Sequence, residues 1–273
     1  MRGALLVFKA EWGRLATTRT FHAVLLLVCL ASLARAISDG IALEGHGIES
    51  GQGWHSLAVG WRTGLVLSTL ILAFSAARGL AGDAQAWILR LALTRGTSRA
   101  GMITARLMLG LGQLLLLVLC SGAGALLGGW FAGGYGPFVV DGAEFGDRSF
   151  FAPEFWRVGF GVLPALAATY AFALFVSAFC QSAVTAVAAS IGLLLSFDLF
   201  KELLGEGSRW FFLAHTPTLL DSSGFTYLDN LCGLATSTAL WEEGYWRAGM
   251  VSSLASVLIF TILAIVVLRR RAL

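Results

Sequence analysis

The chain has 273 residues, of which 57% are hydrophobic and only 13% are charged, and its formal net charge is +3. Soluble domains carry roughly 45–50% apolar and about 25% charged residues, so the composition excludes a soluble globular enzyme. A disordered chain is excluded as well, because Leu, Ala, Val and Phe are abundant. Only four prolines and a lack of long alternating segments favour helices over a β-barrel. We therefore expect an all-α, multi-pass membrane protein without a separate soluble domain.

The first 19 residues are predicted to form an amphipathic elbow helix that precedes the first span. At about 100° per residue, one face of this helix is apolar. It consists of Ala4, Leu5, Phe8, Trp12, Leu15 and Ala16. Lys9 lies beside this face and Arg14 lies opposite to it. Such a helix is expected in the headgroup plane of the cytoplasmic leaflet, and an unstructured basic leader is the alternative.

Six stretches are apolar enough and long enough to cross a bilayer, which takes about 20 residues. They cover residues 20–37, 57–77, 107–130, 158–179, 183–204 and 248–268. The first stretch, followed by Ala34-Arg35-Ala36, also looks like a signal peptide, but the long patterned segment before it favours an uncleaved span. All nine tryptophans fall near span ends or in connections, which is typical of an aromatic belt.

Basic residues are divided unequally between the two sides of the predicted bundle. An even number of spans puts both termini and residues 78–106 on one side, which holds 12 of the 19 basic residues but only two acids, Glu11 and Asp83. The positive-inside rule places this side in the cytoplasm. The external segments are then residues 38–56, 131–157 and 201–247. We expect the last to contain a helix over 225–240 and to rest on the membrane surface or pack over the external mouth.

The cytoplasmic connection over residues 78–106 contains a short apolar helix, predicted to run from Asp83, as its cap, to about Thr94. Gly96 can end it, and Thr97 or Ser98 can begin the next helix. A compact apolar helix between arginines is typical of a docking element for a soluble partner or of a helix that only covers lipid. The candidate partner contacts are Asp83, Trp87, Ile88, Leu89, Arg90, Leu93, Arg95 and Arg99.

The stretch from Asp83 to Leu107 resembles the cytoplasmic loop of type-2 ABC transporter permeases. That pattern runs from an acidic residue through Gly-Thr-Leu, a Leu-rich stretch and Pro-x-Ser-Arg to a basic residue at the start of the third span. The matching positions are Asp83, Leu89, Leu91 to Leu93, Ser98-Arg99 and Arg106, with Trp87-Ile88 in place of Gly-Thr and Gly96 in place of Pro. Further similarity lies in Phe8 to Glu11 and Thr18 to Phe21 (elbow helix), His215 to Pro217 (external proline) and Arg269 to Arg271 (basic end).

This resemblance implies a permease subunit of the bacterial inner membrane that pairs with a second copy or a homologue. The Asp83–Thr94 segment would be a coupling helix seated on a cytoplasmic ABC ATPase dimer. The chain lacks the glycine-rich P-loop motif, so the ATPase subunits would bind ATP and Mg. The chain itself is then not an enzyme, with no catalytic, cofactor or metal site of its own and no nucleic acid partner. An accessory or periplasmic protein on the external segments is compatible with this layout.

A few small or polar residues within the spans are further candidates. Gly124 and Gly128 form a Gly-x-x-x-Gly pattern, which allows close helix packing within the chain or between subunits. Asp198 can pair with Lys201 or with Arg62 near the outer ends of the spans, in a structural or a substrate-related role. A metal site built from the histidines and glutamates of residues 44–55 is not favoured, because their spacing is loose.

Two other classes of membrane protein were weighed against the permease. An ion-coupled secondary transporter would normally show ionisable residues at mid-bilayer and an inverted repeat. An intramembrane enzyme would need a catalytic constellation at one depth, and neither pattern is evident. The scarcity of charges in the spans favours a lipidic or amphipathic substrate, or none, over a free ion. A non-transporting scaffold for a periplasmic assembly stays as an alternative.

The predicted topology can be tested at Cys232, which lies in the external segment 201–247, whereas the other three cysteines lie in apolar runs. A membrane-impermeant thiol reagent should label Cys232 from the periplasmic side in intact cells, with Cys232→Ser as the unlabelled control. If Cys232 is labelled only when the reagent has access to the cytoplasm, the orientation is the reverse of the predicted one.

Overall fold

The computed structural model describes residues 2–43, 48–86, 98–140, 143–217, 219 and 243–270. It confirms the predicted helical membrane fold. A first helix, α1 (Arg2–Thr17), precedes six apolar helices that are long enough to cross a bilayer, so the chain is a multi-pass membrane protein. These are α2 (Arg19–Leu43), α3 (Gly53–Gln85), α5 (Arg99–Phe131), α6 (Arg148–Phe179), α7 (Ala183–Phe200) and α9 (Glu243–Arg270).

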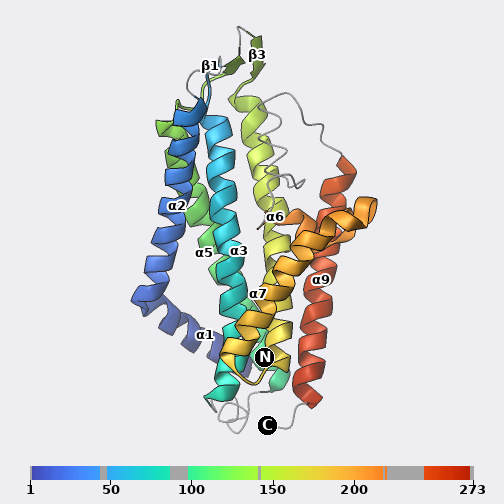
Figure 1. The fold of residues 1–273 in the computed structure, drawn as a ribbon. Helices are drawn as coiled ribbons and strands as arrows, with labels where there is room; N and C mark the ends of the chain where they lie inside the picture. The colour runs from blue at the N-terminus through green and yellow to red at the C-terminus, as the bar shows by residue number, and fades with distance from the viewer. Residues whose placement is uncertain are drawn as a thin grey trace.

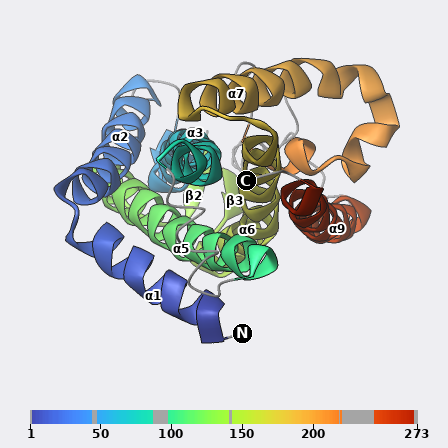
Figure 2. The ribbon, with the colours of Figure 1, turned by 90° about the horizontal axis from the view of Figure 1, so that it is seen from below.

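Helix α3 lies in the middle of the bundle. Viewed along the bundle, α2, α5, α6 and α7 surround α3, and α9 lies against α6 on the far side (Figure 2). The start of α1 and the end of α9 lie at the same end of the bundle (Figure 1), as an even number of spans requires. We call this the inner end and the opposite one the outer end.

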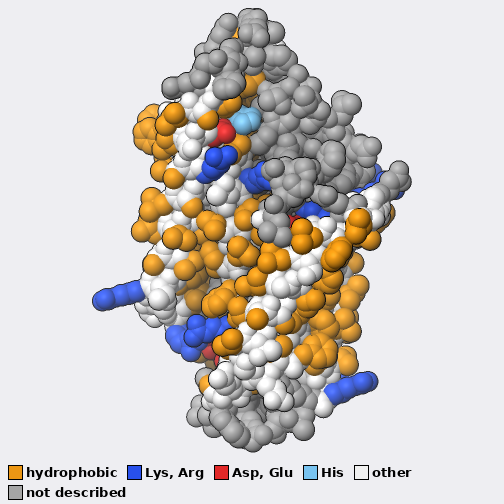
Figure 3. Space-filling view, viewed as in Figure 1, with side chains coloured by type: hydrophobic (Ala, Val, Ile, Leu, Met, Phe, Trp, Pro, Cys, Tyr) orange, Lys and Arg blue, Asp and Glu red, His pale blue; other side chains and the backbone are white. Residues whose placement is uncertain are grey.

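The surface of the bundle has the apolar belt that a bilayer requires. Hydrophobic side chains cover most of the visible face between the two ends, with a few charged side chains in the upper half and others toward the lower end (Figure 3). Large apolar side chains such as Leu27 on α2, Leu119 on α5 and Leu258 on α9 are exposed over more than half of their surface. In water such a surface would aggregate, whereas in a membrane it contacts lipid chains.

Several helices extend beyond the predicted spans. The structure has α3 over Gly53–Gln85 where the prediction had 57–77, and α5 begins at Arg99 where it had 107. The predicted ranges counted apolar residues, so they cover only the part of each helix that can span a bilayer. A helix continues through polar residues when their hydrogen bonds and charges are satisfied.

The start of α6 at Arg148 illustrates the cause. Asp147 caps this helix, because its carboxylate accepts hydrogen bonds from the backbone amides of Ser149 and Phe150 at 2.9 and 3.2 Å. The Ser149 hydroxyl donates to the same oxygen, and together these bonds lower the pKa of Asp147. The capped turn begins well before the first apolar run that hydropathy recognises.

A small sheet at the outer end was not predicted. Strands β1 (Ile48–Ser50), β2 (Phe138–Val140) and β3 (Ala143–Gly146) pair antiparallel in the order β1-β2-β3. Strands this short give no readable alternation in the sequence, and β1 pairs with a strand that follows two membrane helices later. The sheet projects above the helices (Figure 1).

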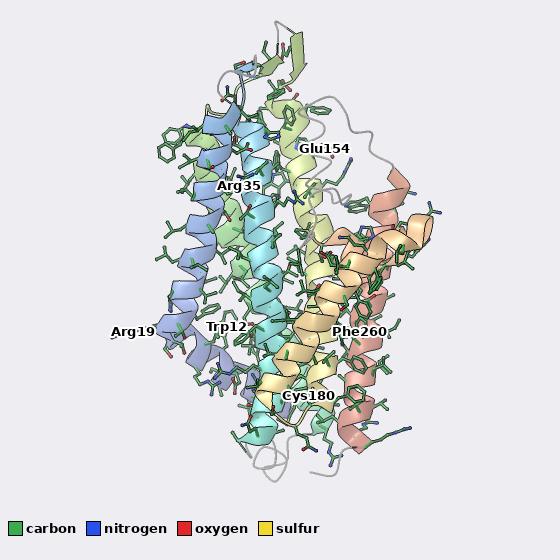
Figure 4. All side chains as sticks on the ribbon, in the orientation of Figure 1. Trp12, Arg19, Arg35, Glu154, Cys180 and Phe260 are labelled. Atoms are coloured by element: carbon green, nitrogen blue, oxygen red, sulfur yellow. The ribbon has the colours of Figure 1, made fainter. Side chains whose placement is uncertain are left out.

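The segment after α7 lies farther from the outer end than predicted. Two 3₁₀ helices follow, η1 (Lys201–Trp210) and η2 (Phe212–His215), at about mid-height of the bundle (Figure 1). The prediction placed this segment on the membrane surface or over the external mouth. In the structure η1 is mostly exposed, whereas η2 is buried among α6, α7 and α9. The ring of Phe212 lies 5.7 Å from that of Phe260 on α9, which points into the bundle (Figure 4). The helix predicted over 225–240 lies outside the described residues.

Helix α5 approaches α2 closely at two glycines. A Cβ added at Gly124 would lie 2.1 Å from the carbonyl oxygen of Cys29, and one at Gly128 would lie 2.5 Å from the Cβ of Ala36. Of the two roles considered for this pattern, the structure shows packing within the chain. Only glycine permits so short a distance between two helix backbones.

The close approach predicts the effect of adding one methyl group. Gly124→Ala should lower the free energy of unfolding by about 1–3 kcal/mol, because the backbone of α2 must move away. Gly192→Ala is the matched control, since a Cβ at Gly192 meets no atom within 4 Å, and it should leave stability unchanged or raise it. Thermal unfolding of both variants in one detergent measures the difference, and equal melting temperatures would contradict the packing argument.

Candidate functional site

A buried ion pair joins the inner ends of α3 and α5. The guanidinium of Arg106, in the second turn of α5, donates a hydrogen bond to the carboxylate of Asp83, in the last turn of α3. Asp83 is 9% exposed and Arg106 is 8% exposed. A buried charge without its partner is strongly destabilising, so the pair fixes the two helix ends relative to each other.

Two further residues extend this pair to α1 and α6. The carboxylate of Glu11 on α1 lies 3.5 Å from the guanidinium of Arg106 and 3.4 Å from that of Arg14. The hydroxyl of Tyr170 on α6 donates to the carbonyl oxygen of Arg106 at 2.9 Å. Arg106 therefore contacts α1, α3 and α6 at once.

The last turns of α3 have two additional anchors. The hydroxyl of Ser177 on α6 donates to the carbonyl oxygen of Ala77 at 2.5 Å and accepts from the amide nitrogen of Ala81 at 3.0 Å. The side-chain oxygen of Gln85 accepts from the amide nitrogen of Ala183, at the start of α7, at 3.2 Å. The end of α3 is thus bonded to α5, α6 and α7.

The start of α5 is bonded to the end of α9. Ser98 caps α5, because its hydroxyl accepts from the amide nitrogen of Gly101 at 3.0 Å, which confirms the predicted helix start at Thr97 or Ser98. The guanidinium of Arg99 donates to the carbonyl oxygens of Leu268, at 3.1 Å, and Arg269. The last carbonyls of a helix lack partners within it, so Arg99 stabilises the end of α9.

We call Glu11, Asp83, Gln85, Arg99 and Arg106 the inner junction. Its bonds connect α1, α3, α5, α6, α7 and α9 at the two points where the 87–97 connection joins the bundle. Most of these contacts are hydrogen bonds, which depend on the distance and orientation of the groups that they join. A displacement of either end of the connection would therefore act on six helices together.

The structure corrects the role expected for Asp83. It was predicted to cap a helix in the connection, but α3 continues through it to Gln85, and its carboxylate binds Arg106. Arg99, also expected to contact a partner, is engaged with α9. The other candidates of the coupling helix lie outside the described residues: Trp87, Ile88, Leu89, Arg90, Leu93 and Arg95.

The predicted elbow helix is present as α1, and it packs against α5 at the inner end (Figure 2). Trp12 points toward the bundle (Figure 4), where a Cβ added at Gly112 would lie 2.4 Å from its ring. Phe8 stacks on Trp12 with the ring centroids 6.0 Å apart. Lys9 and Arg14 are exposed. The middle of the apolar face of α1 therefore packs against the bundle, and its charged side chains point outward.

Two polar clusters lie away from the inner end, one where α7 ends at about mid-height of the bundle (Figure 1) and one at the outer end. Asp198 accepts a hydrogen bond from Lys201 at 2.8 Å, both side chains being buried, and a second from the amide nitrogen of Leu219 at 2.9 Å. Of the two partners considered for Asp198, the structure therefore shows Lys201. Arg62 is half-buried on α3.

The second cluster, at the outer end, joins α2 to the start of α3. The carboxylate of Asp39 lies 2.8 Å from Nδ1 of His55 and accepts from the hydroxyl of Ser56 at 3.1 Å. His55, considered above as a metal ligand, is thus engaged by a carboxylate. Within the described ranges, no three His, Cys, Asp or Glu side chains come close enough to hold a metal ion.

Sequence reasoning missed the pairing at the inner junction, although it singled out three of its members. Asp83 and Arg106 were both matched to the loop pattern of the permeases, but they were not paired with each other. Their opposite charges, near the ends of two successive spans, could have indicated the ion pair. Gln85 and Ser177 had no such signal, because single polar residues in apolar runs are common.

Comparison with known proteins gave no relative: no protein-family model matches the chain, and no curated protein is similar to it. A functional assignment therefore depends on the residues and the geometry described above.

The ion pair predicts a large effect of removing one partner. Asp83→Asn should lower the free energy of unfolding by about 3–5 kcal/mol, because among the described residues it leaves the buried Arg106 charge with Glu11 as its one carboxylate neighbour. Arg78→Gln, at an exposed position earlier in the same helix, is the control and should change stability by about 0.5 kcal/mol or less.

A double-mutant cycle measured by thermal unfolding checks the coupling. Asp83→Asn/Arg106→Gln should be more stable than the sum of the two single changes predicts, because it removes both buried charges. Strict additivity would show that the two side chains do not act as a pair.

Proposed function

We propose that this chain is the permease subunit of an ATP-binding cassette transporter, which couples ATP hydrolysis by separate ATPase subunits to export or to conformational work across the membrane. The observation that carries the proposal is the inner junction, which bonds both ends of the 87–97 connection to most of the bundle. The resemblance of residues 83–107 to the cytoplasmic loop of type-2 ABC permeases supports it.

A permease of this kind must convert motion of a soluble partner into a rearrangement of its spans. A partner shifts a conformational equilibrium only if it binds two states with different affinity. An ATPase docked on residues 87–97 would do so if its own closure displaced the ends of α3 and α5. Because Asp83 and Gln85 are bonded to α5 and α7, that displacement would act on the central helix and its neighbours.

The proposed setting is the bacterial inner membrane with the inner end in the cytoplasm. The described cations at this end are mostly exposed, among them Lys9, Arg78 and Arg269, as the positive-inside rule expects. The ATPase dimer would hold ATP and Mg, and a second permease copy or homologue would complete the membrane pathway. An accessory protein could contact the sheet at the outer end.

The pairing of the described acids favours this proposal over an ion-coupled transporter. Asp39, Asp83 and Asp198 each have a basic partner, respectively His55, Arg106 and Lys201. Coupling ions in secondary transporters bind near the bilayer midplane. Asp198 lies in the last turn of α7, which ends at about mid-height of the bundle (Figure 1), but its carboxylate is already bound by Lys201 and by the amide nitrogen of Leu219. An amphipathic cargo, or conformational work without a cargo, agrees better with these pairings.

The proposal is tested at the connection itself. Leu89→Asp and Leu93→Asp should reduce co-purification of an ATPase subunit from the native host by on the order of tenfold, since a buried leucine contributes about 1.5–3 kcal/mol to a contact. Phe150→Asp, at an exposed position in the first turn of α6 at the outer end, is the control. It should leave co-purification at the level of the unmodified protein.

Insertion into the membrane should be the same for all three variants. If gentle purification of the unmodified chain repeatedly recovers no ATP-binding subunit, the permease proposal is wrong. If the Leu89 and Leu93 variants retain the subunit, the connection is not its docking element.

A further inference from the structure

We propose that the elbow between α1 and α2 binds the phosphate headgroup of an anionic phospholipid of the inner leaflet, and that this binding tightens α1 onto the inner junction. The site consists of Lys9, Arg14 and Arg19 with the neighbouring apolar residues Leu5 and Leu6. It concerns this chain and the bilayer alone, so it does not depend on the proposed ATPase partner.

The elbow and the helix before it present exposed cations. Lys9 and Arg19 are exposed, and the Arg14 side chain is 72% exposed. Arg19 projects away from the helices (Figure 4), where a basic side chain extends from the surface of the bundle (Figure 3). In the described part of the inner end, the two acids, Glu11 and Asp83, are already engaged by arginines. The elbow therefore has an excess of positive charge that an anion from outside the chain can complement.

Apolar side chains lie beside these cations. Leu5 is 59% exposed and Leu6 is 68% exposed, whereas Phe8 and Trp12 on the same helix are partly buried. A helix with exposed leucines next to basic side chains has the two surfaces that a lipid requires, one for the acyl chain and one for the headgroup. An inorganic anion would use only the second, so the geometry favours a phospholipid.

Hydrogen bonds at the turn hold the two arginines on either side of it. The hydroxyl of Thr18 donates to the carbonyl oxygen of Arg14 at 2.6 Å, and that of Thr17 donates to the carbonyl oxygen of Gly13 at 3.0 Å. Arg19 is the first residue of α2. These bonds stabilise the turn, which has Arg14 on its α1 side and Arg19 on its α2 side.

Glu11 connects this surface to the inner junction. Its carboxylate lies between two guanidinium groups, 3.4 Å from Arg14 and 3.5 Å from Arg106. Exposed ion pairs such as Glu11–Arg14 are weak, so a lipid phosphate can displace the carboxylate from Arg14. Glu11 is then left with Arg106 as its cationic partner, which draws α1 toward α5. An anionic lipid would therefore act on the ion pair that holds α3 to α5.

The binding step is tested with the purified full chain by native mass spectrometry. Titration with phosphatidylglycerol should give a first dissociation constant well below that for phosphatidylcholine. Arg14→Gln/Arg19→Gln should raise the phosphatidylglycerol constant by about fivefold per arginine, which is what one surface cation contributes. Arg269→Gln/Arg270→Gln removes two exposed cations from α9 at the same end and should leave the constant unchanged.

A competition arm separates a lipid from a free anion. Soluble glycerol 3-phosphate should not displace phosphatidylglycerol, because it has no acyl chain to cover Leu5 and Leu6. If it competes as well as the lipid does, the elbow is a general anion site and the lipid proposal is wrong. If the α9 double variant weakens binding as much as the elbow variant does, the preference reflects total charge and the proposed site does not exist.

The coupling step is tested by hydrogen exchange of α1 in vesicles. Adding phosphatidylglycerol to phosphatidylcholine vesicles should increase amide protection over residues 4–16 in the unmodified protein. Glu11→Gln should keep the lipid preference but lose this increase, because the neutral amide no longer switches between Arg14 and Arg106. An increase in protection that persists in Glu11→Gln would show that lipid binding does not act through Glu11.

Discussion

The buried contact between Asp83 and Arg106 determines how the inner end of this bundle is built. A carboxylate so close to the end of an apolar helix would normally mark the start of a water-exposed loop. Here the guanidinium of the next helix neutralises it, so α3 continues to Gln85 while α5 already begins at Arg99. The connection over residues 78–106 that hydropathy suggested is thereby reduced to the residues between the end of α3 and the start of α5.

Because α3 is the central helix, whatever holds its end also positions its neighbours. Ser177 bonds its backbone to α6, and Gln85 bonds it to α7. Glu11 adds α1 through Arg106, and Arg99 adds α9. The inner end thus behaves as one connected unit, which is the mechanical property that a permease driven from the cytoplasm would need.

Away from the inner end, the polar contacts form separate clusters. Asp39 with His55 joins α2 to α3 at the outer end, and Asp198 with Lys201 lies where α7 gives way to η1, at about mid-height of the bundle. Between the two ends, α3 and α5 share a neutral contact, the hydrogen bond from Ser75 to Gln113 at 2.8 Å. The charges of Asp198 and Lys201 are both buried, and their mutual attraction offsets the cost of removing each of them from water.

The sequence by itself determined the membrane class, six spans, the elbow helix and the start of α5 at Ser98. These follow from hydropathy, helical periodicity and capping, which depend on residues close together in the chain. It also singled out Asp83, Arg99 and Arg106. Only the tertiary structure decided that Asp83 lies within α3, that Arg99 binds the end of α9, that η2 is buried and that β1 pairs with β2. Each of these outcomes depends on a partner distant in sequence, and local patterns carry no information about which distant residue will arrive beside a given side chain.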